Sequence, residues 1–147
     1  MSNLQLYDQD FYAWANEQAG LLRAGRLSEA DIEHIAEEIE SMGKSEKREL
    51  VSRLTVLLVH LLKWRHQPVR RSTSWRLTIE EQRAQIEYHM ADNPSLKSSF
   101  DETIKAAYYL AILGTIRETG LDRPTFPPLC PWSYEQMMDP DFWPEAT

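Results

Sequence analysis

The chain has 147 residues, of which 42% are hydrophobic, and a formal net charge of -7. A chain of this length buries enough surface to fold as one ordinary domain without disulfides or metal, and its apolar content excludes intrinsic disorder. The single cysteine, Cys130, excludes an intramolecular disulfide. The acidic balance argues against a surface that binds nucleic acid as a whole, although a local patch could still do so.

No targeting or membrane segment is predicted. The N-terminus lacks the basic start and apolar stretch of a signal peptide. The longest strongly apolar stretch, Leu54 to Leu62, is interrupted by Thr55 and His60 and is far shorter than the roughly 20 residues that span a membrane. We therefore expect a cytoplasmic protein without a membrane partner.

Apolar residues recur at spacings of three and four along most of the chain, which is typical of amphipathic helices. With Ser45 and Asn93-Pro94 as start signals and Gly120 as a stop signal, five helices are predicted. Their expected bounds are about 7–24, 29–42, 45–66, 74–91 and 94–119. The pattern also allows the second and third helices to be continuous through Gly43.

The segment 121–147 has a different composition, since it holds six of the eight prolines together with five large aromatic residues. Prolines argue against regular structure, while so many aromatics argue against a disordered tail. The segment is predicted to be an irregular strap packed over the bundle, with one short helical turn capped by Ser133. The sequence thus predicts an all-α fold, with residues 1–147 as a single helical domain.

The stretch 63–76 is the most informative local feature, because it holds five cations, two tryptophans and no acidic residue. Guanidinium groups beside aromatic rings bind phosphates, carboxylates or stacked bases. Arg83 interrupts the apolar face of helix 74–91 and could form the floor of an anion pocket. The candidate ligand or partner surface is therefore Lys63, Trp64, Arg65, Arg70, Arg71, Trp75, Arg76 and Arg83.

A purely structural explanation of the same cations is favoured. Residues 28–40 hold six acidic side chains and no lysine or arginine, so this helix is the charge complement of the basic stretch. A buried Arg83 also requires a partner, which Glu37, Glu38, Glu40 or Glu49 could supply.

His60 is the best single candidate for a catalytic residue, because it lies at the edge of the apolar face of helix 45–66. Its possible companions are Arg53, Lys63 and Arg83. A histidine at a seam between helices more often makes one structural hydrogen bond, and we favour that role.

The acidic flank of Glu33, Glu37 and Glu40 and the spacing Asp31-x-x-His34 are weak signals for a metal. No metal site and no cofactor are predicted.

The chain carries a set of ordered strings, which include Asp10-Phe11-Tyr12-x-Trp14, Glu37-Glu38-Ile39-Glu40-Ser41-Met42-Gly43, His60-Leu61-Leu62-Lys63-Trp64, Asn93-Pro94-Ser95-Leu96 and Glu118-Thr119-Gly120-Leu121. Taken together, these strings resemble the bacterial family called domain of unknown function 29, over about Tyr7 to Glu145. The resemblance implies an all-α protein with no established activity, and it supplies no functional residues.

The leading hypothesis is a non-enzymatic helical module that binds a protein partner or a second copy of itself. One alternative is the binding of an anion, a nucleotide or nucleic acid through residues 63–76, which is possible but not favoured. Another is an uncharacterised helical enzyme or metal protein that uses His60 with nearby carboxylates.

Overall fold

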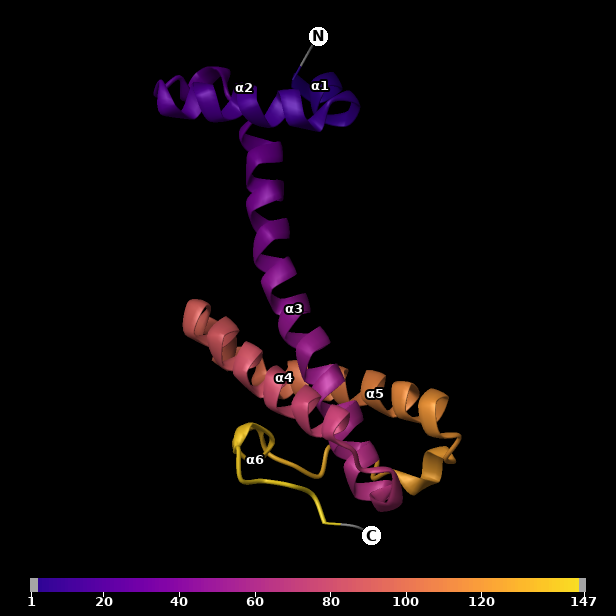
Figure 1. Ribbon diagram of the computed structural model, residues 1–147. Coiled ribbons are helices and arrows are strands. Elements are labelled where there is room, and N and C mark those ends of the chain that lie inside the picture. The colour runs from indigo at the N-terminus through magenta and orange to yellow at the C-terminus, as the bar shows by residue number, and fades with distance from the viewer. Residues whose placement is uncertain (1–2, 146–147) are drawn as a thin grey trace. The chain divides into compact units, whose positions relative to one another are not determined.

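The computed structural model describes residues 3–145, and the described part contains helices and loops but no strand (Figure 1). The all-α fold class is therefore confirmed. The chain divides into two compact units on either side of the bond between Ser45 and Glu46. We call them the smaller unit, up to Ser45, and the larger unit, from Glu46 onward.

The smaller unit contains α1 (Asn3–Gln9), α2 (Phe11–Arg23), a short 3-10 turn at Leu27–Glu29 and the first part of α3. The helix predicted over 7–24 is thus two helices. The break lies at Asp10, whose side chain accepts a hydrogen bond from the Ala13 backbone N–H at 3.1 Å and so caps α2. Trp14 and Gln18 of α2 are buried.

Helix α3 runs without interruption over Ile32–His66. The separate helices predicted over 29–42 and 45–66 are therefore one helix, as the sequence pattern allowed. Gly43 lies inside it with helical residues on both sides. A glycine in a helix costs only about 1 kcal/mol relative to alanine, and the good helix formers around it outweigh that cost.

The larger unit adds α4 (Thr73–Asp92), α5 (Phe100–Thr119) and the short α6 (Tyr134–Met138). The bounds of α4 agree with the prediction within one residue at each end. The predicted fifth helix begins later than expected, because Pro94–Ser99 forms a 3-10 helix before α5. Its end at Gly120 is as expected, since this glycine has a φ of +74° and adopts the left-handed conformation that stops a helix.

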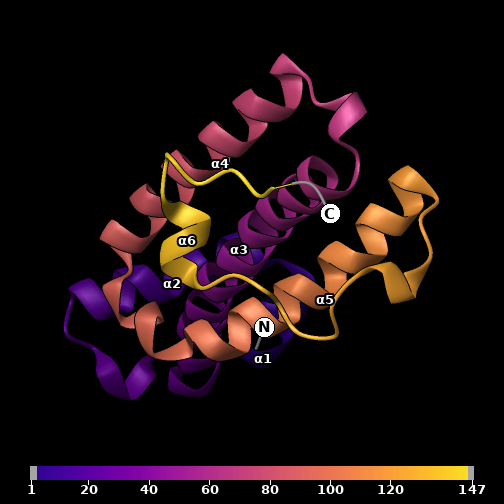
Figure 2. The ribbon, with the colours of Figure 1, turned by 90° about the horizontal axis from the view of Figure 1, so that it is seen from below.

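The core of the larger unit is built around the second part of α3. Six leucines of this helix are fully buried, and α4, α5 and the strap cover them. In Figure 2, α6 and the segment that follows it lie along α4. The strap contributes Phe126, Trp132 and Met137 to the core, and Ser133 begins α6 with a capping box. Among the described residues, no helix is both long enough and apolar enough to cross a membrane.

Candidate functional site

The basic stretch 63–76 makes its contacts with the larger unit's own backbone and rings. Arg71 donates from Nε to the carbonyl of Trp64 at 2.8 Å and from Nη2 to the carbonyl of Pro144 at 3.4 Å. Its guanidinium also lies 5.0 Å from the centre of the Trp64 ring. Arg71 therefore ties the end of α3 to the end of the strap.

Arg83 extends this connection on α4 and is almost completely buried. It donates from Nε to the carbonyl of Met137 at 2.6 Å and from Nη2 to the carbonyl of Phe142 at 2.8 Å. Burial lowers the pKa of Arg83, against the attraction of Asp139 and Glu80. A guanidinium stays charged under such a shift, so Arg83 is a buried cation whose hydrogen-bond partners are backbone carbonyls of the strap.

The remaining cations of the stretch are arranged around the tryptophans. The Lys63 ammonium lies 4.6 Å from the centre of the Trp75 ring, and 3.3 Å from a carboxylate oxygen of Glu118. The Arg76 guanidinium lies 5.5 Å from the centre of the Trp143 ring. Arg65 has a buried Nε, while Arg70 is exposed.

Several cations of this group have partners within the larger unit itself. For Lys63, Arg71, Arg76 and Arg83 the structure gives Glu118, tryptophan rings and carbonyls, all within the larger unit. Trp64 is buried and packs against Trp143 with ring centres 4.7 Å apart. The stretch is thus largely occupied in holding the strap.

One open depression remains beside this cluster. Its volume is about 610 Å³, and Trp64, Arg71, Ser72, Thr73 and Arg76 line it. It is open to solvent, and its two guanidiniums already contact tryptophan rings.

His60 lies half-buried on α3, and its Nδ1 contacts the backbone carbonyl of Val56 at 2.8 Å. Because a carbonyl only accepts, Nδ1 donates this bond. Burial lowers the pKa of His60, although the bond to Val56 opposes the shift. Two of the proposed companions have other partners, since Arg53 pairs with Glu49 and Arg83 holds the strap. The third, Lys63, lies close enough for its charge to lower the pKa of His60 further. His60 therefore makes the local hydrogen bond that was favoured for it.

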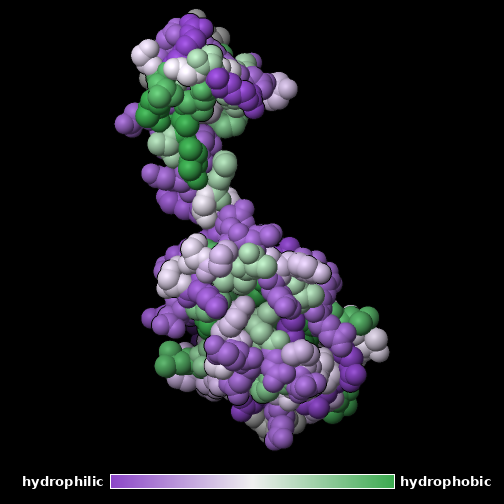
Figure 3. Space-filling model, turned by 90° about the vertical axis from the view of Figure 1, so that its left-hand side faces the viewer, coloured by the Kyte–Doolittle hydropathy of each residue, from purple (hydrophilic) through white to green (hydrophobic). Residues whose placement is uncertain are grey.

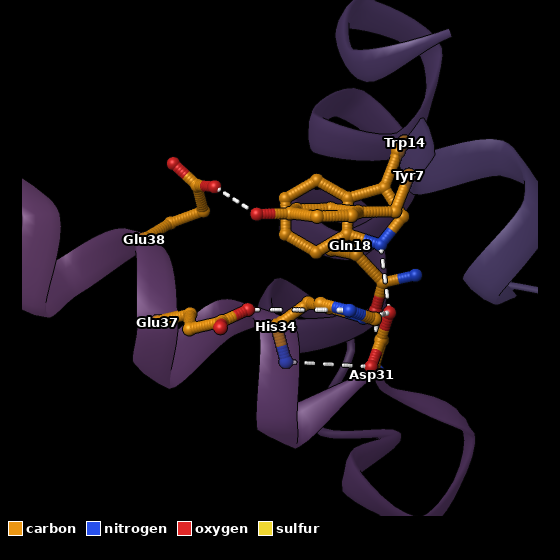
Figure 4. A network of polar contacts seen from close by, with 7 residues as sticks. All are labelled: Tyr7, Trp14, Gln18, Asp31, His34, Glu37 and Glu38. Carbon is orange, nitrogen blue, oxygen red and sulfur yellow. Dashed lines mark hydrogen bonds and ion pairs between the residues drawn. The ribbon is translucent and has the colours of Figure 1, made fainter. Parts of the chain in front are cut away.

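The smaller unit contains a network of polar and aromatic side chains (Figure 4). Asp31 lies at its centre, because Trp14 donates to Asp31 from its indole N–H at 3.0 Å and His34 contacts the same oxygen at 2.7 Å. The buried Gln18 accepts a hydrogen bond from the Asp31 backbone N–H at 2.7 Å. The Tyr7 ring stacks on the His34 ring at 4.0 Å. The network joins all three helices of the unit.

The charges of this network are set by its contacts. The hydrogen bond from Tyr7 to Glu38 and burial raise the pKa of Tyr7 to about 12. The hydrogen bond to Asp31 raises the pKa of His34 above its ordinary value. Burial by itself raises the pKa of Asp31, but the hydrogen bonds from His34 and Trp14 outweigh it and lower that pKa. The pair therefore favours an imidazolium beside a carboxylate.

Replacing Asp31 by asparagine is expected to return the pKa of His34 toward its ordinary value, because the carboxylate is lost while an asparagine still caps α3. Because the pKa of His34 is raised and that of Asp31 is lowered, the pair stabilises the smaller unit fully between pH about 3.9 and about 6.5. This stabilisation disappears as the pH rises through the His34 pKa of the folded chain, and also as the pH falls through the Asp31 pKa of the folded chain. An NMR titration of the His34 ring measures the shift. Glu40→Gln on the same helix is the control and should leave it unchanged.

Hydrophobic side chains gather on one face of the smaller unit (Figure 3). Three exposed residues of α3 have large apolar side chains: Ile32 (54% exposed), Ile39 (62%) and Met42 (63%). Two leucines that precede α3 in the sequence, Leu22 and Leu27, are exposed as well. The spacing of these α3 residues predicted a helix, but nothing within the unit covers them. We call Leu22, Leu27, Ile32, Ile39 and Met42 the apolar face.

An apolar groove of about 560 Å³ lies between α5 and the strap, with Phe100, Ile104, Tyr108 and Cys130 among its lining residues. The Tyr108 hydroxyl donates to the carbonyl of Pro127 at 2.6 Å. Burial raises the pKa of Tyr108 to about 12 and also raises that of the Cys130 thiol. Both groups remain protonated near neutral pH, so neither is an activated nucleophile.

A cluster formed by Glu46, Glu49 and His89 was not predicted from the sequence. The His89 Nδ1 lies 2.8 Å from a carboxylate oxygen of Glu49 and 3.7 Å from one of Glu46. Two signals were available in the sequence. Glu46 and Glu49 are one helical turn apart, and His89 follows the buried Ile86 by three residues, on the same side of α4.

Comparison with known proteins gives one match. The model of the family described as "Domain of unknown function DUF29" matches residues 6–143. No curated protein and no solved structure matches the chain.

Proposed function

The chain belongs to the family of domain of unknown function DUF29, which has no assigned activity, so we propose a function from the structure. We propose that the protein is a helical module that associates with a second copy of itself through the apolar face. The exposure of this face is the observation that carries the proposal. Burial of one such side chain contributes about 1.5–3 kcal/mol, and monomers rarely leave a contiguous apolar patch in water.

The spacing of the α3 residues fits a helix-to-helix seam. Ile32, Ile35, Ile39 and Met42 follow one another at intervals of three, four and three, which places them at the a and d positions of two heptads. Side chains with this spacing form the stripe that packs into a facing helix. The seam ends at Gly43, and charged residues follow it.

Charge complementarity supports a second copy in the antiparallel orientation as the partner of this seam. The part of α3 before Gly43 carries glutamates and no lysine or arginine, whereas Lys44, Lys47 and Arg48 follow directly after it. Two α3 helices paired antiparallel place Glu33 of one copy near Lys44 of the other, whereas parallel pairing places like charges together. The helix is therefore complementary to itself in one orientation only.

The first test is the molar mass in solution. The full-length chain is expected to sediment as a dimer at on the order of 100 µM. Ile39→Glu should weaken dimerisation about tenfold or more, because it places a charge in the seam. The matched control is Val69→Glu, since Val69 is 97% exposed and belongs to the larger unit. A wild-type chain that remains monomeric contradicts the proposal, as does equal weakening by both variants.

The orientation is tested by cross-linking. One chain carries Glu33→Cys and the other Lys44→Cys, both in a Cys130→Ser background, so that each chain has one thiol. An antiparallel dimer brings the two thiols together, and oxidation of the mixture should give mainly the mixed disulfide. A preference for disulfides between identical chains instead contradicts the antiparallel arrangement.

A further inference from the structure

His89 lies in the last turn of α4 with its side chain only 7% exposed, and both of its ring nitrogens face oxygen atoms. Nε2 is 2.8 Å from the backbone carbonyl oxygen of Glu46. Nδ1 is 2.8 Å from a carboxylate oxygen of Glu49 and 3.7 Å from one of Glu46. Carbonyl and ionised carboxylate oxygens only accept hydrogen bonds, so every one of these neighbours requires positive charge or a proton from the ring.

A neutral imidazole carries a single N–H and cannot satisfy both sides. The carbonyl oxygen of Glu46 can only accept a hydrogen bond, so Nε2 carries a proton and donates it to this oxygen. Nδ1 then faces two carboxylates, and this arrangement requires a cation there, which is either a second ring proton or a metal ion. In histidines that bind a metal through one ring nitrogen, the N–H of the other ring nitrogen commonly donates to a carbonyl, which fixes the orientation of the ring.

We propose that Glu46, Glu49 and His89 bind a divalent transition-metal ion, for which Zn²⁺ is the test ion. The three ligand atoms lie within 4.8 Å of one another. Ligands at about 2.0–2.2 Å around a tetrahedral ion are separated by about 3.4 Å, so small rotations of the two glutamates suffice. An imidazole ligand favours such an ion over Mg²⁺ or Ca²⁺, which prefer oxygen alone.

The surroundings of the cluster support the same assignment. Asn93 donates to the Glu46 carboxylate at 3.4 Å, and Arg53 donates to the second oxygen of Glu49 at 3.3 Å. Asn93 also donates to the backbone carbonyl of His89 at 3.1 Å, so it joins the Glu46 carboxylate to the last turn of α4. The carboxylates of Glu46 and Glu49 are 48% and 44% exposed, so the site is open to solvent on one side. Three protein ligands with an open side leave a coordination position for water, as in sites where zinc is reactive.

Isothermal titration of the full-length chain with ZnCl₂, after treatment with a chelator, tests the proposal. One ion per chain is expected to bind, and MgCl₂ should give no binding at the same concentrations. Glu46→Gln and Glu49→Gln keep the shape of the side chain but remove the charge, and each should weaken Zn²⁺ binding about a hundredfold or more. Glu81→Gln, an exposed glutamate of α4, is the matched control and should bind as the wild type does.

Both glutamate positions are exposed, so these variants should fold, and circular dichroism verifies it. The titrations are repeated in an Ile39→Glu background, which separates this site from any zinc bound between chains. Absence of one-site binding overturns the proposal, and so does binding that both glutamine variants retain. A doubly protonated His89 ring at pH 8, measured by ¹⁵N chemical shifts in the metal-free chain, also overturns it, because a proton would then be the cation of the cluster.

Discussion

Replacing Arg83 by methionine is expected to lower the free energy of unfolding of the larger unit by about 3–5 kcal/mol. Methionine fills a similar volume but donates no hydrogen bond, so the carbonyls of Met137 and Phe142 lose their charged donor. A hydrogen bond to a charged group contributes about 1.5–3 kcal/mol, and each buried acceptor left without a donor costs about 1–3 kcal/mol. Because both carbonyls belong to the strap, the loss should detach the strap from α4 first.

Urea unfolding followed by circular dichroism measures this effect, and hydrogen exchange of the strap amides locates it. Arg70→Met is the matched control, because Arg70 is an exposed arginine of the larger unit and its replacement should change stability by less than about 0.5 kcal/mol. If Arg83→Met unfolds at the same urea concentration as the wild type, Arg83 does not hold the strap.

Replacing Trp64 by alanine is expected to cost about 3–5 kcal/mol, as is usual for a buried tryptophan. The Trp64 ring is buried between α3 and the strap, where it contacts Trp143 and the guanidinium of Arg71. This prediction separates the two explanations of the basic stretch. Replacing a residue of a ligand surface would leave the free energy of unfolding nearly unchanged, whereas replacing a core residue lowers it strongly.

The same urea experiment tests Trp64→Ala against Tyr88→Ala. Tyr88 is 72% exposed in the larger unit, and its loss should cost less than about 0.5 kcal/mol. Similar unfolding midpoints for the two variants would contradict the packed position of Trp64.

Helices were predictable where the end signals are local. The side chain of Ser72 caps the start of α4, and Asn93 directly follows its last residue. Both residue types are common at helix ends, so the bounds of α4 were predicted closely. Asp10 was missed, because Tyr7, Phe11 and Trp14 continue the apolar spacing across it and conceal the break. Gly43 has the opposite effect, since it resembles a stop signal but has a conformation that a helix accepts at modest cost.

The candidate site was predicted only in part. The position of Arg83 on α4 correctly indicated a buried guanidinium that needs partners. The partners are backbone carbonyls, which every residue has, so no side chain in the sequence marks them. His89 illustrates the same limit, because its cluster depends on how α4 packs against α3 and not on any local motif.

The continuity of α3 determines how the protein can be dissected. Boundaries between compact units usually fall in flexible linkers that a protease can cut. Here the boundary lies within a hydrogen-bonded helix, so no loop separates the units at Ser45. Serine is nevertheless a residue that commonly caps the start of a helix, and Ser45 was predicted to do so. A chain that began at Ser45 would keep this serine to cap the N–H groups exposed at the new start of the helix. The serine that goes unused inside the intact helix is therefore the position at which we would shorten the chain to test whether the larger unit folds alone.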